Sequence, residues 1–337
     1  MYKLIKQFFS LLTIKQRKNF FLLQFLVIFA SAAEIVGVIS IIPFMTLVGD
    51  IGVLQEEGLI GKIYQMSGYS SGTDFVFLMG VLVLIMLLIS SLTSIFTVWR
   101  LSMFAAKIGT EIGNRLYRYY LNMGWLYHTT QNSAELTKKV VNETQRITNG
   151  ILMPLMNLNA KIALAFFMIV TLFIFDPIVS TLGIVIIGSA YIILYKIVRL
   201  RLLENGRNVS EIFSERYLLL SEGFGGIKDI LLYGRNKNFT NRFDKAGNKL
   251  AKSLGTNQAL SMMPRYFIEL IAFAIMISLT LYLILNYKGD LGVVIPLLSV
   301  YAVAAIKILP AFQQIYLNIA NIRANISAFE VIQKDLI

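Results

Sequence analysis

Charged side chains inside long apolar stretches are the residues of this sequence that could do chemistry. The stretch YAVAAIKILPAF contains one cation, Lys307, three residues before a proline. Lys161, Glu34 and Glu269 lie in three other apolar stretches, and Arg265 precedes Glu269 by about one helical turn. A charge in hydrocarbon costs about 2.5–3.5 kcal/mol on insertion scales. Each of these groups therefore needs a partner, a ligand or a route to the membrane surface.

Depth along a helix leaves two interpretations of these charges open. At 1.5 Å per residue, Lys161, Glu269 and Lys307 lie roughly 22, 27 and 25 Å from the predicted outer turns. In the structural interpretation, Glu269 pairs with Lys307 or Arg265, and Lys161 reaches the inner headgroups. In the functional interpretation, the three cations bind an anionic headgroup and Glu269 orients them. The same helical rise, counted from Asn19, places Glu34 roughly 21 Å up, nearer the outside and apart from the other charges. Glu34 is then either a hydrogen-bonded packing residue or a substrate contact.

Composition excludes several chemistries. The chain has no cysteine and a single histidine, His128, so neither a thiolate site nor a multi-histidine metal centre is expected. No apolar stretch carries paired carboxylates, which disfavours a membrane-embedded lipid-processing enzyme. We therefore predict no catalytic residue, no metal site and no cofactor on this chain. With 56% hydrophobic and 15% charged residues, the sequence is too apolar for a water-soluble domain, which carries about 25% charge.

Six stretches approach or exceed the ~20 apolar residues that a membrane helix needs. They are 20–48, 75–99, 147–175, 178–195, 266–287 and 291–322. The sequence therefore predicts an all-α, polytopic membrane protein with six transmembrane helices. A secondary transporter is a weaker alternative, because that class usually shows broken spans and internal repeats and has no use for long cytosolic helical segments such as those at 100–146 and 196–265.

The basic residues predict the orientation. Of the 31 Lys and Arg residues, 27 fall in four segments, 1–18, 100–146, 196–265 and the tail after 322. Because basic residues favour the cytosolic side, both termini and the two long loops are predicted to be cytosolic. The net charge of +12 then needs no nucleic-acid partner.

The two long cytosolic segments are predicted to be helical extensions of the spans. Apolar residues recur there at three- and four-residue intervals, which indicates amphipathic helices. The helices are expected to turn back at 122–136 and 221–230, where glycine or asparagine interrupts them. Residues 1–18 are predicted to form an amphipathic elbow helix on the inner membrane surface, followed by the six-helix domain at 19–337.

This pattern resembles the transmembrane domain of an ABC exporter, with two coupling helices at the cytosolic turns. The resemblance implies contacts to an ATPase domain from Trp125, Leu126 and His128 in the first turn. In the second turn it implies contacts from Glu222, Phe224, Gly225 and Gly226. It also implies a homodimer, with ATP and Mg²⁺ bound by the nucleotide-binding domain. No G-x-x-x-x-G-K-[ST] phosphate loop occurs in the chain, so that domain is expected beyond Ile337 or on a separate chain.

More narrowly, Glu34, Pro264-Arg265…Glu269 and Lys307…Pro310 resemble features of the bacterial flippase for lipid-linked oligosaccharides. That flippase has arginine at the position of Lys307. The resemblance implies an anionic lipid-linked substrate moved by alternating access, and a location in the bacterial inner membrane. Export of peptides or of other lipids is the alternative within the same family.

Overall fold

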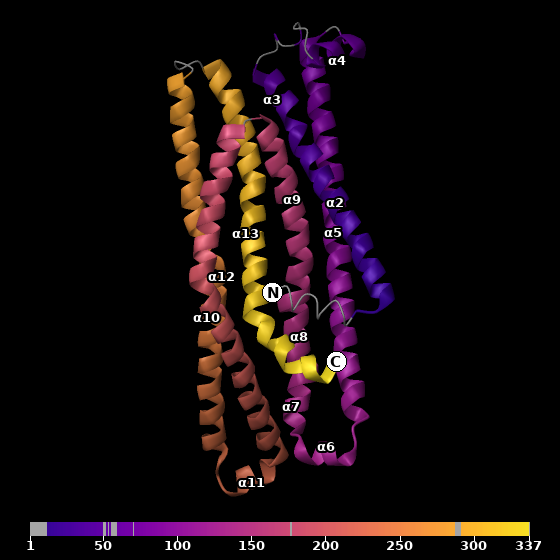
Figure 1. Ribbon diagram of the computed structural model, residues 1–337, viewed down its shortest axis with the longest axis vertical. Coiled ribbons are helices and arrows are strands. Elements are labelled where there is room, and N and C mark those ends of the chain that lie inside the picture. The colour runs from indigo at the N-terminus through magenta and orange to yellow at the C-terminus, as the bar shows by residue number, and fades with distance from the viewer. Residues whose placement is uncertain are drawn as a thin grey trace.

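The computed structural model describes residues 12–49, 52, 54, 59–69, 71–175, 177–286 and 291–336 of the chain. Across these residues the ordered structure is helical, and long helices run side by side along one axis (Figure 1). The elements are α2 (Ile14–Ile39), α3 (Ile41–Gly49), α4 (Leu59–Ser67), α5 (Gly72–Leu121), α6 (Trp125–Thr130), α7 (Ser133–Lys138), η2 (Lys139–Glu143), α8 (Thr144–Ile147), η3 (Thr148–Leu152), α9 (Met153–Phe175), α10 (Pro177–Gly225), α11 (Ile227–Leu232), α12 (Asn236–Asn286) and α13 (Leu291–Leu336). The predicted all-α fold is confirmed.

Five helical segments within the described residues are long and apolar enough to cross a membrane. They are Ile14–Gly49, Gly72–Leu121, Ser133–Ile174, Ser180–Gly225 and Asn236–Tyr282. The sixth predicted stretch falls on α13, a helix of 46 residues. The count of six spans remains a prediction, with α13 in the place of the sixth.

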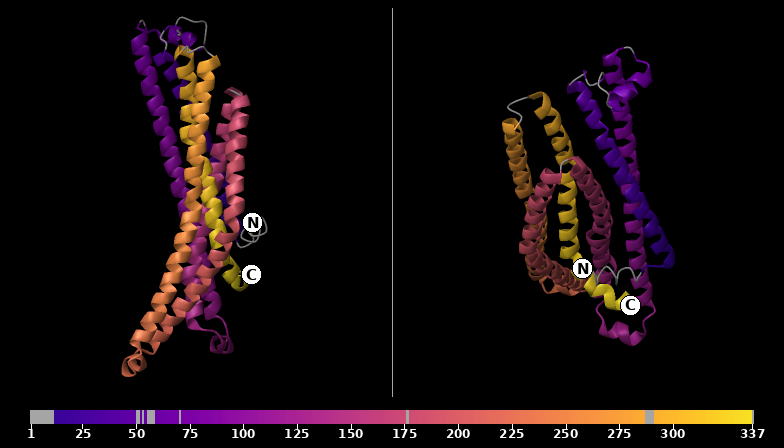
Figure 2. Two further views of the ribbon diagram at one scale, coloured as in Figure 1. Left: turned by 90° about the vertical axis from the view of Figure 1, so that its left-hand side faces the viewer. Right: turned by 45° about the horizontal axis from the view of Figure 1, so that its top comes forward.

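The longest helices extend well past a bilayer. α5, α10 and α12 contain 50, 49 and 51 residues. At 1.5 Å per residue each is roughly 75 Å long, against about 30 Å for the hydrocarbon core. The two short helices α6 and α11 both lie at one end of the molecule, set apart from each other (Figures 1 and 2). The expected long extensions with short connecting helices are therefore present.

The first long helix begins earlier than the sequence suggested. Thr13 caps α2 in a capping box, since its hydroxyl accepts from the Gln16 amide while the Gln16 side chain accepts from the Thr13 amide. Residues 14–18, which were expected in the elbow helix, are therefore the first turn of α2. The remainder of that expected helix, residues 1–11, lies outside the described residues.

Glycines allow the lower part of α13 to pack closely on its neighbours. A Cβ at Gly206 of α10 would overlap the carbonyl oxygen of Ala324, and one at Gly150 of η3 would overlap the Asn325 side chain. Around these contacts, Phe329 and Ile332 of α13 are almost fully buried. They join one apolar core with residues of α2, α5 and α9, including Leu155 of α9. The lower part of α13 is thereby packed against α10 and η3 and, through the apolar core, against α2, α5 and α9.

Candidate functional site

Lys307 and Glu34 form an ion pair between α13 and α2. The Lys307 Nζ donates to Glu34 Oε1 at 2.9 Å, with side-chain exposures of 39% and 19%. The expectation that Glu34 is isolated was therefore wrong. Its depth was counted from the first residue of an apolar stretch, but α2 already begins at Ile14, so that residue does not mark the membrane boundary. The partial exposure of Lys307 leaves the pair open to exchange with another anion.

Arg265 and Glu269 form a second ion pair within α12. The Arg265 Nε donates to Glu269 Oε1 at 2.7 Å, across four residues of the helix. The predicted pairing of Glu269 with Arg265 is confirmed, whereas its alternative pairing with Lys307 does not occur. The Arg265 side chain is 62% exposed, so its guanidinium has free donors for a ligand.

The predicted cations do not share one hydrogen-bonded network among the described residues. No hydrogen bond or ion pair joins the Arg265–Glu269 pair to the Lys307–Glu34 pair among the residues that the structure describes. Lys161 is half-buried on α9, where it follows Ala160, whose carbonyl accepts from Ser31 of α2 at 3.5 Å. Arg265 and Lys307 therefore each have a carboxylate partner of their own, and their joint role in an anion site stays a prediction.

The short helix α6 presents apolar side chains outward while its base is fixed. Trp125 and Leu126 are 82% and 78% exposed. On the inner side, His128 Nε2 donates to the carbonyl of Tyr120 at 3.0 Å, and the Tyr127 ring stacks on that of Tyr120. Burial raises the pKa of the Tyr127 phenol, and the nearby Asp335 carboxylate adds to the rise. The arrangement is a rigid support for an apolar contact surface.

The second short helix lies later in the sequence than predicted. α10 continues through Gly225, because the Gly226 amide still donates to the Glu222 carbonyl at 2.9 Å. Glu222, Phe224 and Gly225 thus belong to the last turn of α10, and only Gly226 lies between the helices. The sharp turn comes after α11 at Gly234, whose φ of 63° suits glycine. The glycines thus end α10 as predicted, and the further turn of the chain at Gly234 was not predicted.

The α11 end also presents apolar side chains, of which the sequence interpretation named Phe224 and missed the other three. Phe224, Leu232 and Tyr233 are 74%, 78% and 71% exposed, and Leu231 is 64% exposed. The apolar run ILLY directly before Gly234 was the available signal, but the predicted turn ended at 230. We refer to Phe224, Leu231, Leu232 and Tyr233 as the α11 surface, and to Trp125 and Leu126 as the α6 surface.

A buried ionic network, which the sequence did not reveal, ties the α6 end of the molecule together. The Glu143 side chain is fully buried and accepts from Arg146 Nη1 at 2.9 Å. The Lys138 Nζ lies 3.8 Å from the same carboxylate and 2.6 Å from Ser214 Oγ. Arg146 also donates to Ser210 of α10, and further to the Gly206 carbonyl, Ser327 and Asn325. The network thus joins α8 to α10 and α13.

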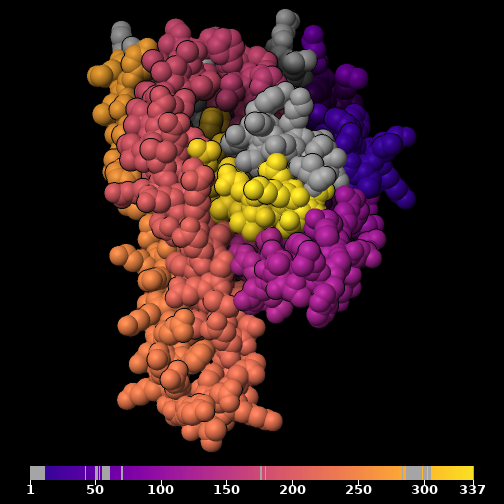
Figure 3. Space-filling view, turned by 60° about the horizontal axis from the view of Figure 1, so that its bottom comes forward, coloured from indigo at the N-terminus to yellow at the C-terminus, as the bar shows by residue number. Residues whose placement is uncertain are grey.

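The end of α13 is anchored close to α6. Asp335 Oδ2 accepts from the Tyr120 hydroxyl at 2.6 Å and from Lys139 Nζ at 2.9 Å. Tyr120 is in the last turn of α5, two residues before the segment that leads into α6. The space-filling view shows the end of α13, in yellow, lying against the surface of the α5–α8 region, in magenta (Figure 3). A movement of the α6 surface is therefore mechanically connected to α13.

These features define a class of protein: a bundle of apolar helices, with long extensions that end in two exposed apolar helices. The sequence model of the family described as "ABC transporter transmembrane region" matches residues 20–306. The chain belongs to this family. The resemblance to an ABC exporter that the sequence suggested is thereby confirmed at the level of the family.

A solved structure agrees on the fold. The chain is similar to the "Structure of a bacterial Atm1-family ABC exporter with ATP bound", with a TM-score of 0.66 and 12% sequence identity. The similarity covers 90% of this chain and 53% of that one, so the chain spans about half the length of that exporter. The fold is that of an ABC exporter transmembrane domain.

Proposed function

We propose that this chain is the membrane-spanning part of an ATP-driven exporter or flippase that moves an amphipathic, anionic substrate by alternating access. The observation that carries the proposal is the pair of exposed apolar surfaces, α6 and α11, at the ends of the ~75 Å helices. Exposed apolar groups gathered at one end of a bundle are typical of a docking surface. The occupant we infer is an ATPase domain, which would hold ATP and Mg²⁺.

The proposed assembly is a homodimer. Two copies together would enclose a central path between their helices, and closure of the ATPase domains would draw the α6 and α11 surfaces together. The anchors at Tyr120 and Asp335 would pass this movement to α13.

The proposed substrate carries a phosphate-like group, as a lipid-linked oligosaccharide does. Lys307 is part-exposed, so a phosphate can compete with Glu34 for its ammonium group by offering charge-assisted hydrogen bonds of the same kind. Arg265 presents a more exposed guanidinium for the same chemistry. Peptides or other lipids are the alternative substrates in the same family.

We further propose that the chain lies in a bacterial inner membrane with the α6–α11 end in the cytosol. A cysteine at Lys228 of α11, which is exposed, is expected to resist a membrane-impermeant thiol reagent applied to intact cells. Lys62→Cys, in α4 at the opposite end of the bundle, is expected to react. The chain has no native cysteine, so the labelling is unambiguous. The reverse pattern would contradict the orientation.

The α11 surface supplies the experiment that tests the docking role. Phe224→Ala is expected to weaken docking by about 2 kcal/mol, roughly 30-fold, because a truncated aromatic anchor at an interface has an effect of this size. Substrate-stimulated ATP hydrolysis and transport should both fall in proteoliposomes of the complete transporter. Phe77→Ala removes an equally exposed ring from the start of α5, far from α11, and serves as the matched control. Unchanged stimulation and transport in Phe224→Ala would show that α11 does not couple to the ATPase.

A further inference from the structure

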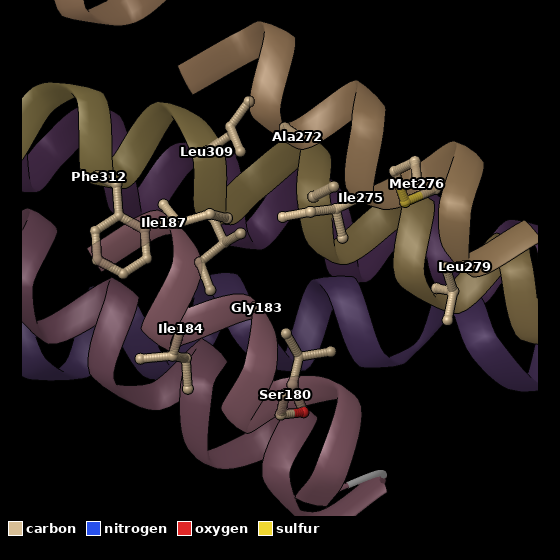
Figure 4. Close-up of a pocket in the computed structure, with 13 residues that line it drawn as sticks. Ser180, Gly183, Ile184, Ile187, Ala272, Ile275, Met276, Leu279, Leu309 and Phe312 are labelled. Atoms are coloured by element: carbon tan, nitrogen blue, oxygen red, sulfur yellow. The ribbon is translucent and has the colours of Figure 1, made fainter. Parts of the chain in front are cut away.

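A cavity lies between α10, α12 and α13, beside the first turns of α10. It is lined by residues from 180–187 of α10, 272–279 of α12 and 305–312 of α13, with Leu172 from α9 (Figure 4). Each of the three ranges extends over roughly 10 Å of helix. The start of α10 lies lower than the upper ends of α12 and α13 in two side views, so the cavity is placed within the bundle (Figures 1 and 2).

Small residues create this space. A Cβ added to Gly183 would meet no atom within 4 Å, so this glycine faces open volume. Ala272 of α12 and Ala305 of α13 line the same cavity from the other two helices. The cavity has a volume of about 110 Å³. That is close to the ~150 Å³ of an engineered apolar cavity that stays dry and takes up benzene.

The lining favours hydrocarbon over water. Apart from Ser180, the side chains that line the cavity are apolar, and the Ser180 hydroxyl is itself buried without a hydrogen-bond partner among the described residues. A buried water needs two to four polar partners, which these walls do not offer. A charged or sugar-bearing group would meet no ligand there. The occupant must therefore be apolar.

The surroundings of the cavity indicate the source of that occupant. Leu182 and Ile186 of α10 are 58% and 43% exposed, and Phe273 and Ile277 of α12 are also exposed. These apolar faces flank the cavity within segments that are long and apolar enough to span a membrane. The medium available to the cavity is therefore the hydrocarbon of the bilayer itself.

We propose that this cavity binds the end of one acyl chain of a bilayer phospholipid. The chain end would fill the space left by Gly183, Ala272 and Ala305, and would replace the missing protein contacts between α10, α12 and α13. The site concerns a phospholipid of the surrounding membrane, so it stands independently of which substrate the transporter moves.

Photolabelling tests this site. The full-length protein is reconstituted in phosphatidylcholine vesicles that contain a phosphatidylcholine with a diazirine near the end of one acyl chain, and adducts are mapped by mass spectrometry. Adducts are expected on Met276, Leu279 and Leu309, which line the cavity. Gly183→Leu should abolish these adducts, because its Cβ meets no atom within 4 Å and the rest of the leucine side chain would occupy the cavity.

Gly188→Leu is the matched control, because it lies on the same helix, also meets nothing within 4 Å, and does not line the cavity. This variant should keep the adducts. Ala305→Leu fills the cavity from α13 and serves as a second blocking variant if Gly183→Leu fails to fold. Labelling confined to exposed residues such as Phe273 and Ile277, or unchanged cavity labelling in both folded blocking variants, would overturn the proposal.

Discussion

Replacement of Glu143 by leucine is expected to destabilise the protein by about 3–5 kcal/mol, because it leaves two buried cations without their shared counter-ion. The Glu143 side chain is fully buried, while Lys138 and Arg146 are 3% and 11% exposed. Leucine fills much of the volume but accepts no hydrogen bond. The loss should appear as a lower midpoint of thermal unfolding in detergent or lipid, measured on the otherwise unchanged chain.

The control for this prediction lies in the same network. Glu135 also pairs with Lys138, at 2.8 Å, but its side chain is 34% exposed to solvent. Glu135→Gln is therefore expected to change the free energy of unfolding by no more than about 1 kcal/mol, as for other part-exposed ion pairs. Equal destabilisation by the two variants would mean that burial does not determine the strength of this network.

Loss of transport is the expected result of Lys307→Gln, because glutamine has no positive charge to hold a phosphate-like group. Lys307→Arg should keep most of the activity, since arginine also binds phosphate. Transport is measured in proteoliposomes of the complete transporter. The ion pair with Glu34 complicates a single substitution, because removal of Lys307 leaves a carboxylate uncompensated.

A double substitution separates substrate binding from structure. Glu34→Gln alone should retain transport, because it leaves Lys307 charged and more available to an anion. In the double variant Glu34→Gln/Lys307→Gln no charge is left unpaired, so a purely structural role predicts recovery of transport. Our proposal predicts that the double variant stays inactive while its dimer and unfolding midpoint remain intact. Recovery of transport would assign the pair to structure alone.

Hydropathy and charge were sufficient to predict the fold class and the long extensions. Apolar stretches of about 20 residues identify helices in hydrocarbon because the backbone there must satisfy its own hydrogen bonds. The two named contact residues Trp125 and Phe224 are indeed exposed at the ends of the extensions, while their contact with an ATPase domain stays a prediction. The start of α11 was not predicted. A glycine near the end of a helix can still belong to that helix, so Gly225 and Gly226 in succession did not mark a single boundary between α10 and α11.

The partners of the charged residues were harder to predict. The pairing of Arg265 with Glu269 follows from helical spacing and could be read from the sequence. The pairing of Lys307 with Glu34 depends on how α2 and α13 lie beside each other, which helical rise does not determine. Glu143 occurs in a segment with ordinary amphipathic character, so its complete burial by α10 and α13 left no trace in the sequence.

The most direct test of the proposed function is translocation of a fluorescent, phosphate-bearing lipid across vesicles that contain the complete transporter. The rate is measured with Mg-ATP, without nucleotide, and with Phe224→Ala in place of the native chain. We predict rapid translocation with Mg-ATP, background translocation without nucleotide, and a rate close to background for Phe224→Ala. Translocation at the same rate with and without ATP, or no translocation of any phosphate-bearing amphipathic substrate, would contradict the proposal that this chain is the membrane path of an ATP-driven exporter of anionic amphipathic molecules.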